Sequence, residues 1–104
     1  MTTDSFCPVA AAAEIVGRKW ALIVIHNLME SPRGFNELKR LIKGVSSKTL
    51  SNSLAFMTEE GIIERQVYQN SPIRVEYSLT EKGVEMKRLM DEMKKWGESR
   101  LTTS

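Results

Sequence analysis

The sequence is poor in the residues that catalysis, metal binding and disulfide cross-linking require. Its 104 residues include one cysteine, Cys7, and one histidine, His26. They supply neither an internal disulfide nor the usual zinc site of four Cys and His ligands. Neither a Ser/His/Asp order nor a phosphate- or dinucleotide-binding glycine pattern occurs. His26 sits inside an apolar run, where we expect core packing, so we expect no enzyme activity, no metal and no cofactor.

Long apolar runs are missing as well. No uninterrupted apolar stretch of the sequence approaches the roughly 20 residues needed to cross a bilayer. The start of the chain, up to Pro8, has neither the basic nor the apolar region of a secretory signal. With the single cysteine, these features predict a cytoplasmic protein without membrane contact.

The length and the charge of the chain limit which classes of protein remain possible. A chain of this size fits one domain, residues 1–104. Its formal net charge of +2 is too small to indicate nucleic-acid binding by itself. Residues 1–52 carry seven Lys or Arg and four acids (+3), whereas residues 53–104 carry eight and nine (−1). This asymmetry permits a polyanion-binding face but does not require one.

Two helices are predicted before the first strong turn. Pro8 suits the first turn of a helix, and the alanine-rich segment that follows continues to residue 16, before Gly17. By periodicity alone, residues 19–30 fit either a buried strand or a buried helix. Because the run has no breaker and is long for a strand, its length favours a helix.

The next predicted unit consists of a short helix, a glycine-containing turn and a longer helix. Apolar residues at helical spacing predict a helix over 35–42, with Asn36 as an N-cap candidate. Ser46 can cap the following helix, and Gly61 fits the position just after its end.

The periodicity changes after Gly61. Residues 62–68 are rich in β-branched and aromatic side chains, and residues 73–79 alternate strictly between apolar and polar. The turn-forming residues between them predict a hairpin with one buried face, and a short edge strand is possible near 33–35. Thr80 then begins a last helix, expected over 80–97. The predicted fold is α+β and mainly helical.

The layout over residues 35–60 is that of a helix-turn-helix, in which the second helix enters the major groove of DNA. Leu50 and Leu54 would anchor this helix to the body. The side chains expected to project from it are polar or basic and belong to Ser47, Lys48, Thr49, Ser51 and Asn52.

These side chains suit a duplex. Lys48 can meet a phosphate or the guanine O6/N7 edge, and Asn52 can pair with adenine N6/N7. Spacing alone also fits a solvated amphipathic helix with an exposed serine-rich face, so the helix by itself leaves both interpretations open.

The hairpin over residues 62–79 favours the DNA interpretation, because a basic hairpin directly after the reading helix forms the wing of a winged-helix domain. The wing residues that could reach the DNA backbone or minor groove are Arg65, Gln69, Asn70 and Arg74. An ordinary polar hairpin with solvated charges is the other possibility.

Six short blocks, in this order, resemble the HxlR family and span about nine-tenths of the chain. They read Cys7-Pro8-Val9, Gly17-Arg18-Lys19-Trp20, Arg33-Gly34-Phe35-Asn36-Glu37-Leu38, Ser46-Ser47-Lys48-Thr49-Leu50-Ser51, Glu60-Gly61-Ile62-Ile63-Glu64-Arg65 and Arg74-Val75-Glu76-Tyr77-Ser78-Leu79-Thr80. The resemblance implies a winged helix-turn-helix with a two- to three-stranded wing. It also implies a regulator that binds operator DNA as a homodimer, and it assigns residues 19–30 to a helix.

The resemblance further implies dimerisation through the first and last helices. Gly34 stands where many members carry a second Arg or a similar polar residue, which leaves Arg33 as the expected backbone contact. The last helix carries more apolar surface than a small core can cover, a feature of interfaces. Within its stripe we expect Met86 and Leu89 to close the core. The predicted interface residues are Val9, Met90, Met93 and Trp96.

Cys7 is the candidate for redox sensing. Some regulators of the HxlR type resemble this chain in having a cysteine just before a proline at the first helix, and use it to sense oxidants or electrophiles. Physically, the positive end of a helix stabilises a thiolate and raises its reactivity. An inert, half-buried cysteine is the alternative.

We therefore predict a homodimeric transcription regulator, acting as a repressor on a palindromic operator in double-stranded DNA. A two-fold dimer would place two reading helices about 34 Å apart, one turn of duplex. A winged-helix module that binds protein and not DNA is the alternative. The sequence names neither the operator nor a small-molecule effector.

Overall fold

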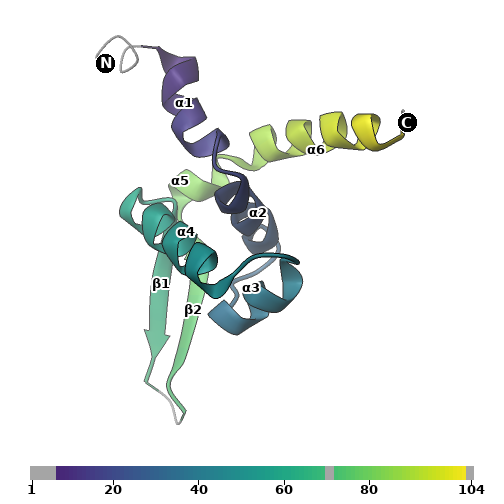
Figure 1. Cartoon of the computed structure of the whole chain (residues 1–104). Coiled ribbons are helices and arrows are strands. Elements are labelled where there is room, and N and C mark those ends of the chain that lie inside the picture. Colours follow the sequence, from purple (N-terminus) through teal and green to yellow (C-terminus); the bar gives the residue numbers. More distant parts are fainter. Residues whose placement is uncertain (1–6, 70–71, 103–104) are drawn as a thin grey trace.

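The computed structural model describes residues 7–69 and 72–102, which form helices and one two-stranded sheet (Figure 1). The elements are α1 (Pro8–Val16), α2 (Lys19–Leu28), α3 (Phe35–Leu41), α4 (Ser47–Glu59), β1 (Ile63–Tyr68), β2 (Arg74–Leu79), α5 (Glu81–Val84) and α6 (Lys87–Thr102). This is the predicted α+β, mainly helical arrangement of a winged helix-turn-helix.

The core lies where α2, α3 and α4 meet the base of the hairpin. The buried hydrophobic side chains come from these parts and from the link between α3 and α4: Ala21, Val24, Ile25, Leu28, Leu38, Ile42, Val45, Leu50, Leu54, Met57, Ile62 and Ile63. Residues 19–28 are helical, which confirms the prediction for this segment. His26, predicted to pack in the core, is instead exposed, because the apolar face of α2 points to the other side.

The two ends of α4 show how local sequence sets its length. The Ser46 side chain accepts a hydrogen bond from the backbone N–H of Thr49 at 3.0 Å, as expected for an N-cap. Gly61 follows the last turn with a φ of 77°, which glycine adopts without strain. The Gly61 and Ile62 N–H groups then donate to the carbonyls of Thr58 and Met57, the Schellman closure of a helix.

α3 begins differently from the prediction. Its N-cap is Gly34, which offers no side-chain hydrogen bond, and Asn36 lies inside the first turn. The chain enters α3 directly from the backbone pairing of Arg33 with the sheet. That pairing fixes where the helix begins, so no capping side chain determines the start.

β1 and β2 form an antiparallel hairpin in which Ile63 pairs with Leu79 at the base and Tyr68 with Arg74 toward the tip. A third, single-residue strand flanks it, since Arg33 and Tyr77 exchange both backbone hydrogen bonds at 2.8 and 3.0 Å. The edge strand anticipated near residues 33–35 is therefore present as this one bridge. The wing is thereby attached to the segment between α2 and α3.

The prediction of one continuous last helix over residues 80–97 is wrong. The chain forms the short α5, turns at residues 85–86 and then forms α6, which continues to Thr102. α5 is held against the base of the hairpin, because Thr80 Oγ1 donates to the Ile62 carbonyl and Lys82 Nζ to that of Glu60. A tight turn, in which the Met86 N–H bonds the Gly83 carbonyl at 3.0 Å, then redirects the chain into α6.

α1 and α6 both extend from the body at the end opposite the tip of the wing (Figure 1). The radius of gyration is 15.1 Å, whereas a compact chain of this length has about 13 Å. In a single copy of the chain, α1 and α6 therefore protrude from the body and few other residues surround them.

Candidate nucleic-acid interface

α4 presents a continuous polar face to solvent. Leu50, Leu54 and Met57 are buried and hold the helix to the body. The opposite face, at spacings of one helical turn, is exposed and consists of Ser47, Lys48, Ser51, Asn52 and Ala55. The structure thus brings four of the predicted reading residues onto one surface, with a small alanine beside them that would let a groove approach closely.

Thr49, the fifth predicted reading residue, has a different environment. It is half-buried, its N–H donates to Ser46 Oγ, and its hydroxyl accepts from the same Oγ at 3.0 Å. Thr49 therefore completes the cap of α4, which leaves its side chain less available than those of Lys48 and Asn52.

Two cations that spacing had not singled out flank the reading face. The Arg18 guanidinium lies 3.7 Å from the centre of the Phe56 ring, and Lys19 Nζ lies 4.7 Å from the centre of the Trp20 ring. Such cation–π contacts hold a charge at the surface while leaving its outer side open. These cations help to line a hollow of about 250 Å³ with Thr49, Asn52 and Ser53. Because α2 and α4 meet only in the folded chain, no local signal marks this cationic surface.

The wing adds charge on the other side of α4. Arg65 and Tyr77, paired across the hairpin, line a hollow of about 450 Å³ together with Ser51, Ala55 and Thr58 of α4. Arg74 lies 4.8 Å from the centre of the Tyr68 ring, and its guanidinium is 3.9 Å from a Glu76 carboxylate oxygen. Arg65 therefore lies along the edge of the reading face, whereas Arg74 lies toward the tip of the hairpin.

The tip of the wing is only partly covered by the structure. Gln69 is exposed, and Asn70 lies outside the described residues. The expected contact of Asn70 with DNA stays a prediction.

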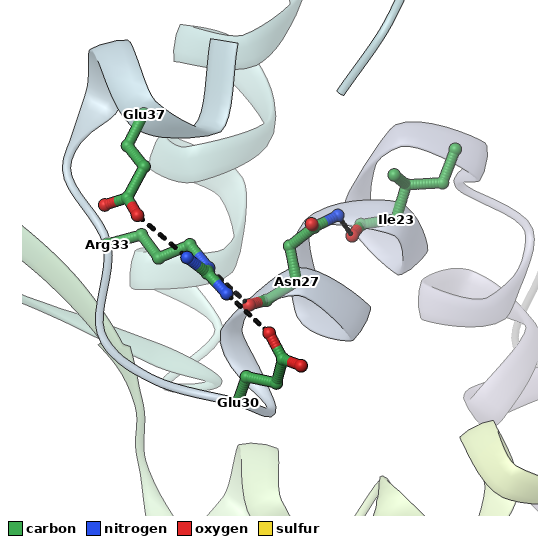
Figure 2. A network of polar contacts seen from close by, with 5 residues as sticks. All are labelled: Ile23, Asn27, Glu30, Arg33 and Glu37. Atoms are coloured by element: carbon green, nitrogen blue, oxygen red, sulfur yellow. Dashed lines mark hydrogen bonds and ion pairs between the residues drawn. The ribbon is translucent and has the colours of Figure 1, made fainter. Parts of the chain in front are cut away.

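Arg33, the predicted backbone contact, donates from each of its three guanidinium nitrogens to a partner within the protein. Nε donates to the Asn27 carbonyl at 2.8 Å, Nη1 to Glu37 at 2.8 Å and Nη2 to Glu30 at 2.7 Å. Figure 2 shows these three contacts converging on one guanidinium, while the Asn27 amide donates in turn to the Ile23 carbonyl at 2.8 Å. The Arg33 side chain is 14% exposed and faces two carboxylates. This geometry weighs against a phosphate contact and indicates a brace between α2, α3 and the wing.

We expect Arg33→Ala to lower the free energy of unfolding by about 1–2 kcal/mol, because charge-assisted hydrogen bonds are lost but both carboxylates are partly solvated. The melting temperature should fall by roughly 5–12 °C. The exposed Arg40→Ala is the matched control and should shift it little. A stable Arg33→Ala protein that has lost affinity for DNA would show that Arg33 contacts DNA after all.

The candidate interface and sensor residues lie on α1 and α6. Cys7 is exposed, and its Sγ accepts from the Ala10 N–H at 3.5 Å as the N-cap of α1. Val9 is 77% and Trp96 67% exposed, and Met93 is half-buried.

Two methionines and one leucine from the apolar stripe predicted for the last helix also have defined surroundings. Met86 and Met90 are partly buried and pack against the core cluster, whereas Leu89 is exposed. Met86 thus lies where core closure was expected, while Leu89, predicted to close the core, lies outside it. The interface role of Met90 stays a prediction.

Two other kinds of feature, a cluster of possible metal ligands and a membrane-spanning helix, are not found in the part of the chain that the structure describes. Within residues 7–69 and 72–102, no group of three His, Cys, Asp or Glu side chains is arranged to hold a metal ion. Over the same ranges, no helix is long and apolar enough to cross a membrane.

Comparison with known proteins agrees with the winged helix-turn-helix architecture. A family model described as HxlR-like helix-turn-helix matches residues 15–104. An uncharacterised HTH-type transcriptional regulator of Bacillus subtilis, YybR, is 36% identical over 93 residues, which are 89% of this chain and 74% of that protein.

Two solved structures are also similar over most of their length. The redox regulator HypR in its oxidised form is 35% identical, with a TM-score of 0.85 over 89% of this chain and 96% of that chain. The reduced form of the transcriptional regulator YodB from B. subtilis is 33% identical, with a TM-score of 0.81 over 94% and 97%.

The protein is therefore a helix-turn-helix regulator with a winged β-hairpin. More narrowly, the chain belongs to the HxlR-like helix-turn-helix family. Its named relatives are HTH-type transcriptional regulators. Cys7 lies before the segment that the family model matches.

Proposed function

We propose that this protein is a homodimeric transcription regulator that reads a palindromic operator through the exposed face of α4. The observation that carries the proposal is the division of α4 into a buried leucine face and an exposed face with Lys48, Ser51 and Asn52. A major groove about 12 Å wide admits one helix with its side chains. The thirteen residues of α4 extend about 20 Å, enough to cross it.

The chemistry around α4 divides into two tasks. Lys48 and Asn52 carry the donors and acceptors that suit guanine and adenine edges. Arg18, Lys19 and Arg65 lie beside the reading face, where cations meet phosphates and fix the register of the protein on the duplex. Contacts of the second kind supply affinity without sequence preference.

Dimerisation is inferred from the helices that extend from the body. Val9 on α1 and Trp96 and Leu101 on α6 are all more than half exposed. Large apolar side chains gathered on protruding helices indicate an interface. A second copy of the chain would cover them and would set two reading helices about 34 Å apart, as a palindromic operator requires. We further propose that the dimer acts as a repressor when it occupies the operator.

The proposal is tested by fluorescence anisotropy with duplex DNA from upstream of the protein's own coding sequence, titrated at several salt concentrations. Three to five phosphate contacts per protomer predict a slope of log K against log salt of about −5 to −9. We also expect preference for that DNA over a scrambled duplex. A slope near zero, or equal affinity for the scrambled DNA, would contradict the proposal and favour a protein-binding module.

We further propose that Cys7 makes operator binding responsive to oxidants or electrophiles. Its thiol is exposed at the N-terminal end of α1, where Sγ accepts from the Ala10 N–H and is open to a reagent from solvent. HypR, whose structure is similar, is a redox regulator, and this supports the same idea by analogy.

The reagent for testing Cys7 is N-ethylmaleimide, to whose alkene the thiolate adds. We expect the adduct to weaken operator binding about tenfold in the wild-type protein and to leave Cys7→Ser unaffected. Alkylated wild-type protein that binds the operator as before would rule out sensing by this residue.

A further inference from the structure

Arg18 joins three helices at one point. It is the residue between Gly17 and the first residue of α2, and its backbone forms the N-cap of that helix. Its Nε donates to the carbonyl of Glu14 in the last turns of α1, at 3.2 Å. Its guanidinium lies 3.7 Å from the centre of the Phe56 ring on α4. One side chain therefore contacts both α1 and the reading helix.

α1 has few other attachments. None of its residues, all of which the structure describes, is fully buried. Of the α1 side chains, Ile15 alone belongs to the hydrophobics packed against the core. The link to α2 is short, and the Gly17 and Arg18 N–H groups return to the carbonyls of Ala13 and Ile15 at 2.8 and 3.0 Å. Ile15, with the half-buried Val16 beside it, fixes the position of the C-terminal end of α1, and few contacts farther along the helix hold its tilt.

We infer that Arg18 is a positioning residue that fixes the tilt of α1 relative to α4, and thereby the half-site spacing that the dimer accepts. The inference rests on the proposed function, in which α1 contributes to the dimer interface. If α1 is held by the partner, any tilt between α1 and α4 changes the separation of the two reading helices. Arg18 thus determines specificity for spacing and need not touch a base.

α1 is long enough that a small tilt would move its far end by a distance comparable to one base-pair step. Nine helical residues extend about 13 Å. A tilt of about 15° would move the far end of α1 by about 3.5 Å, close to the rise of about 3.4 Å per base pair. Loss of the Arg18 contacts therefore has a predicted consequence of about one base pair in spacing.

The planar guanidinium is needed for this geometry. It stacks on a ring while Nε donates sideways, whereas a lysine ammonium has no planar face and no second donor along the stem. We therefore expect Arg18→Lys to behave more like Arg18→Ala than like the wild-type protein. Phe56→Leu, which removes the ring and retains an apolar side chain, should have the same effect.

The test measures affinity for three operators whose half-sites are separated by the natural spacing, one base pair less and one base pair more. We expect the wild-type protein to prefer the natural spacing at least tenfold. In Arg18→Ala, Arg18→Lys and Phe56→Leu the preference should fall below threefold. Circular dichroism and gel filtration verify that each variant is folded and dimeric.

Lys19→Ala is the matched control, because Lys19 is the adjacent cation and also lies over an aromatic ring, but on its own helix. It should weaken binding to all three operators alike and keep the spacing preference.

The alternatives have distinct results. If the Arg18 variants keep the tenfold preference while binding more weakly overall, Arg18 is an ordinary phosphate contact and the inference is wrong. A wild-type protein that binds DNA but tolerates both altered spacings equally also overturns it. A wild-type protein that fails to bind DNA at all overturns the proposed function instead, and the inference with it.

Discussion

Replacing Lys48 and Asn52 together with alanine should weaken operator binding by about 1,000-fold or more while leaving the protein folded. Each base contact of this kind is worth roughly 1–3 kcal/mol, and a dimer loses it in both half-sites. Both side chains are exposed, and neither has a hydrogen bond or ion pair within residues 7–69 and 72–102. The measurement is anisotropy at fixed salt with the operator and with a scrambled duplex.

The two single variants should differ in kind. Asn52→Ala should lower the preference for the operator over scrambled DNA, because amides read bases. Lys48→Ala should also reduce the salt slope if it meets a phosphate. Lys94→Ala, an exposed cation on α6, lowers the net charge by the same amount and serves as the control. Unchanged affinity in the double variant would remove α4 from the binding surface.

Gly83→Ala should destabilise the protein by about 3 kcal/mol, since the added methyl overpacks a rigid site. A Cβ at this position would lie 2.3 Å from the Ile62 carbonyl oxygen and 3.0 Å from Leu79 Cδ2. The carbonyl has little freedom to move, because it accepts from both the N–H and the hydroxyl of Thr80 at 3.0 Å. α5 would therefore have to lift from the base of the hairpin.

The fall in melting temperature expected for Gly83→Ala is roughly 10–20 °C, compared at equal protomer concentration. Gly97→Ala is the control, because its Cβ would meet no atom within 4 Å and alanine favours a helix. Its melting temperature should stay the same or rise. If the two variants melt together, the close approach of Gly83 to Ile62 does not contribute to stability.

Features of the fold with a local cause were predictable from sequence. Ser46 and Gly61 mark the ends of α4 because a cap and a left-handed turn are chemical properties of single residues. The alternation of apolar and polar residues over 73–79 is likewise a local feature, and it predicted β2. The break between α5 and α6 was not predictable, because it depends on the approach of Gly83 to Ile62 across the fold.

The candidate site also has one part that the sequence predicted and another part that depends on contacts across the fold. The exposed face of α4 follows from the spacing of Leu50 and Leu54, and the structure places it as expected. The environment of Arg33 was not foreseen, because Glu30, Glu37 and the Asn27 carbonyl converge on it only in the folded chain. Arg18 was not identified as a site residue, since its partner Phe56 is on another helix. Charges in a linear sequence do not reveal which of them are already paired.

The most direct test of the account asks whether the outer face of α4 lies against DNA bases. A photoactivatable cross-linker attached to Ser51→Cys in a Cys7→Ser background reports on that face, and Glu85→Cys, exposed between α5 and α6, is the matched position. The account predicts cross-links from residue 51 to bases in two patches about one helical turn apart, and none from residue 85. Cross-linking that is equal at both positions, or absent from residue 51 in a complex that binds the operator, would contradict it.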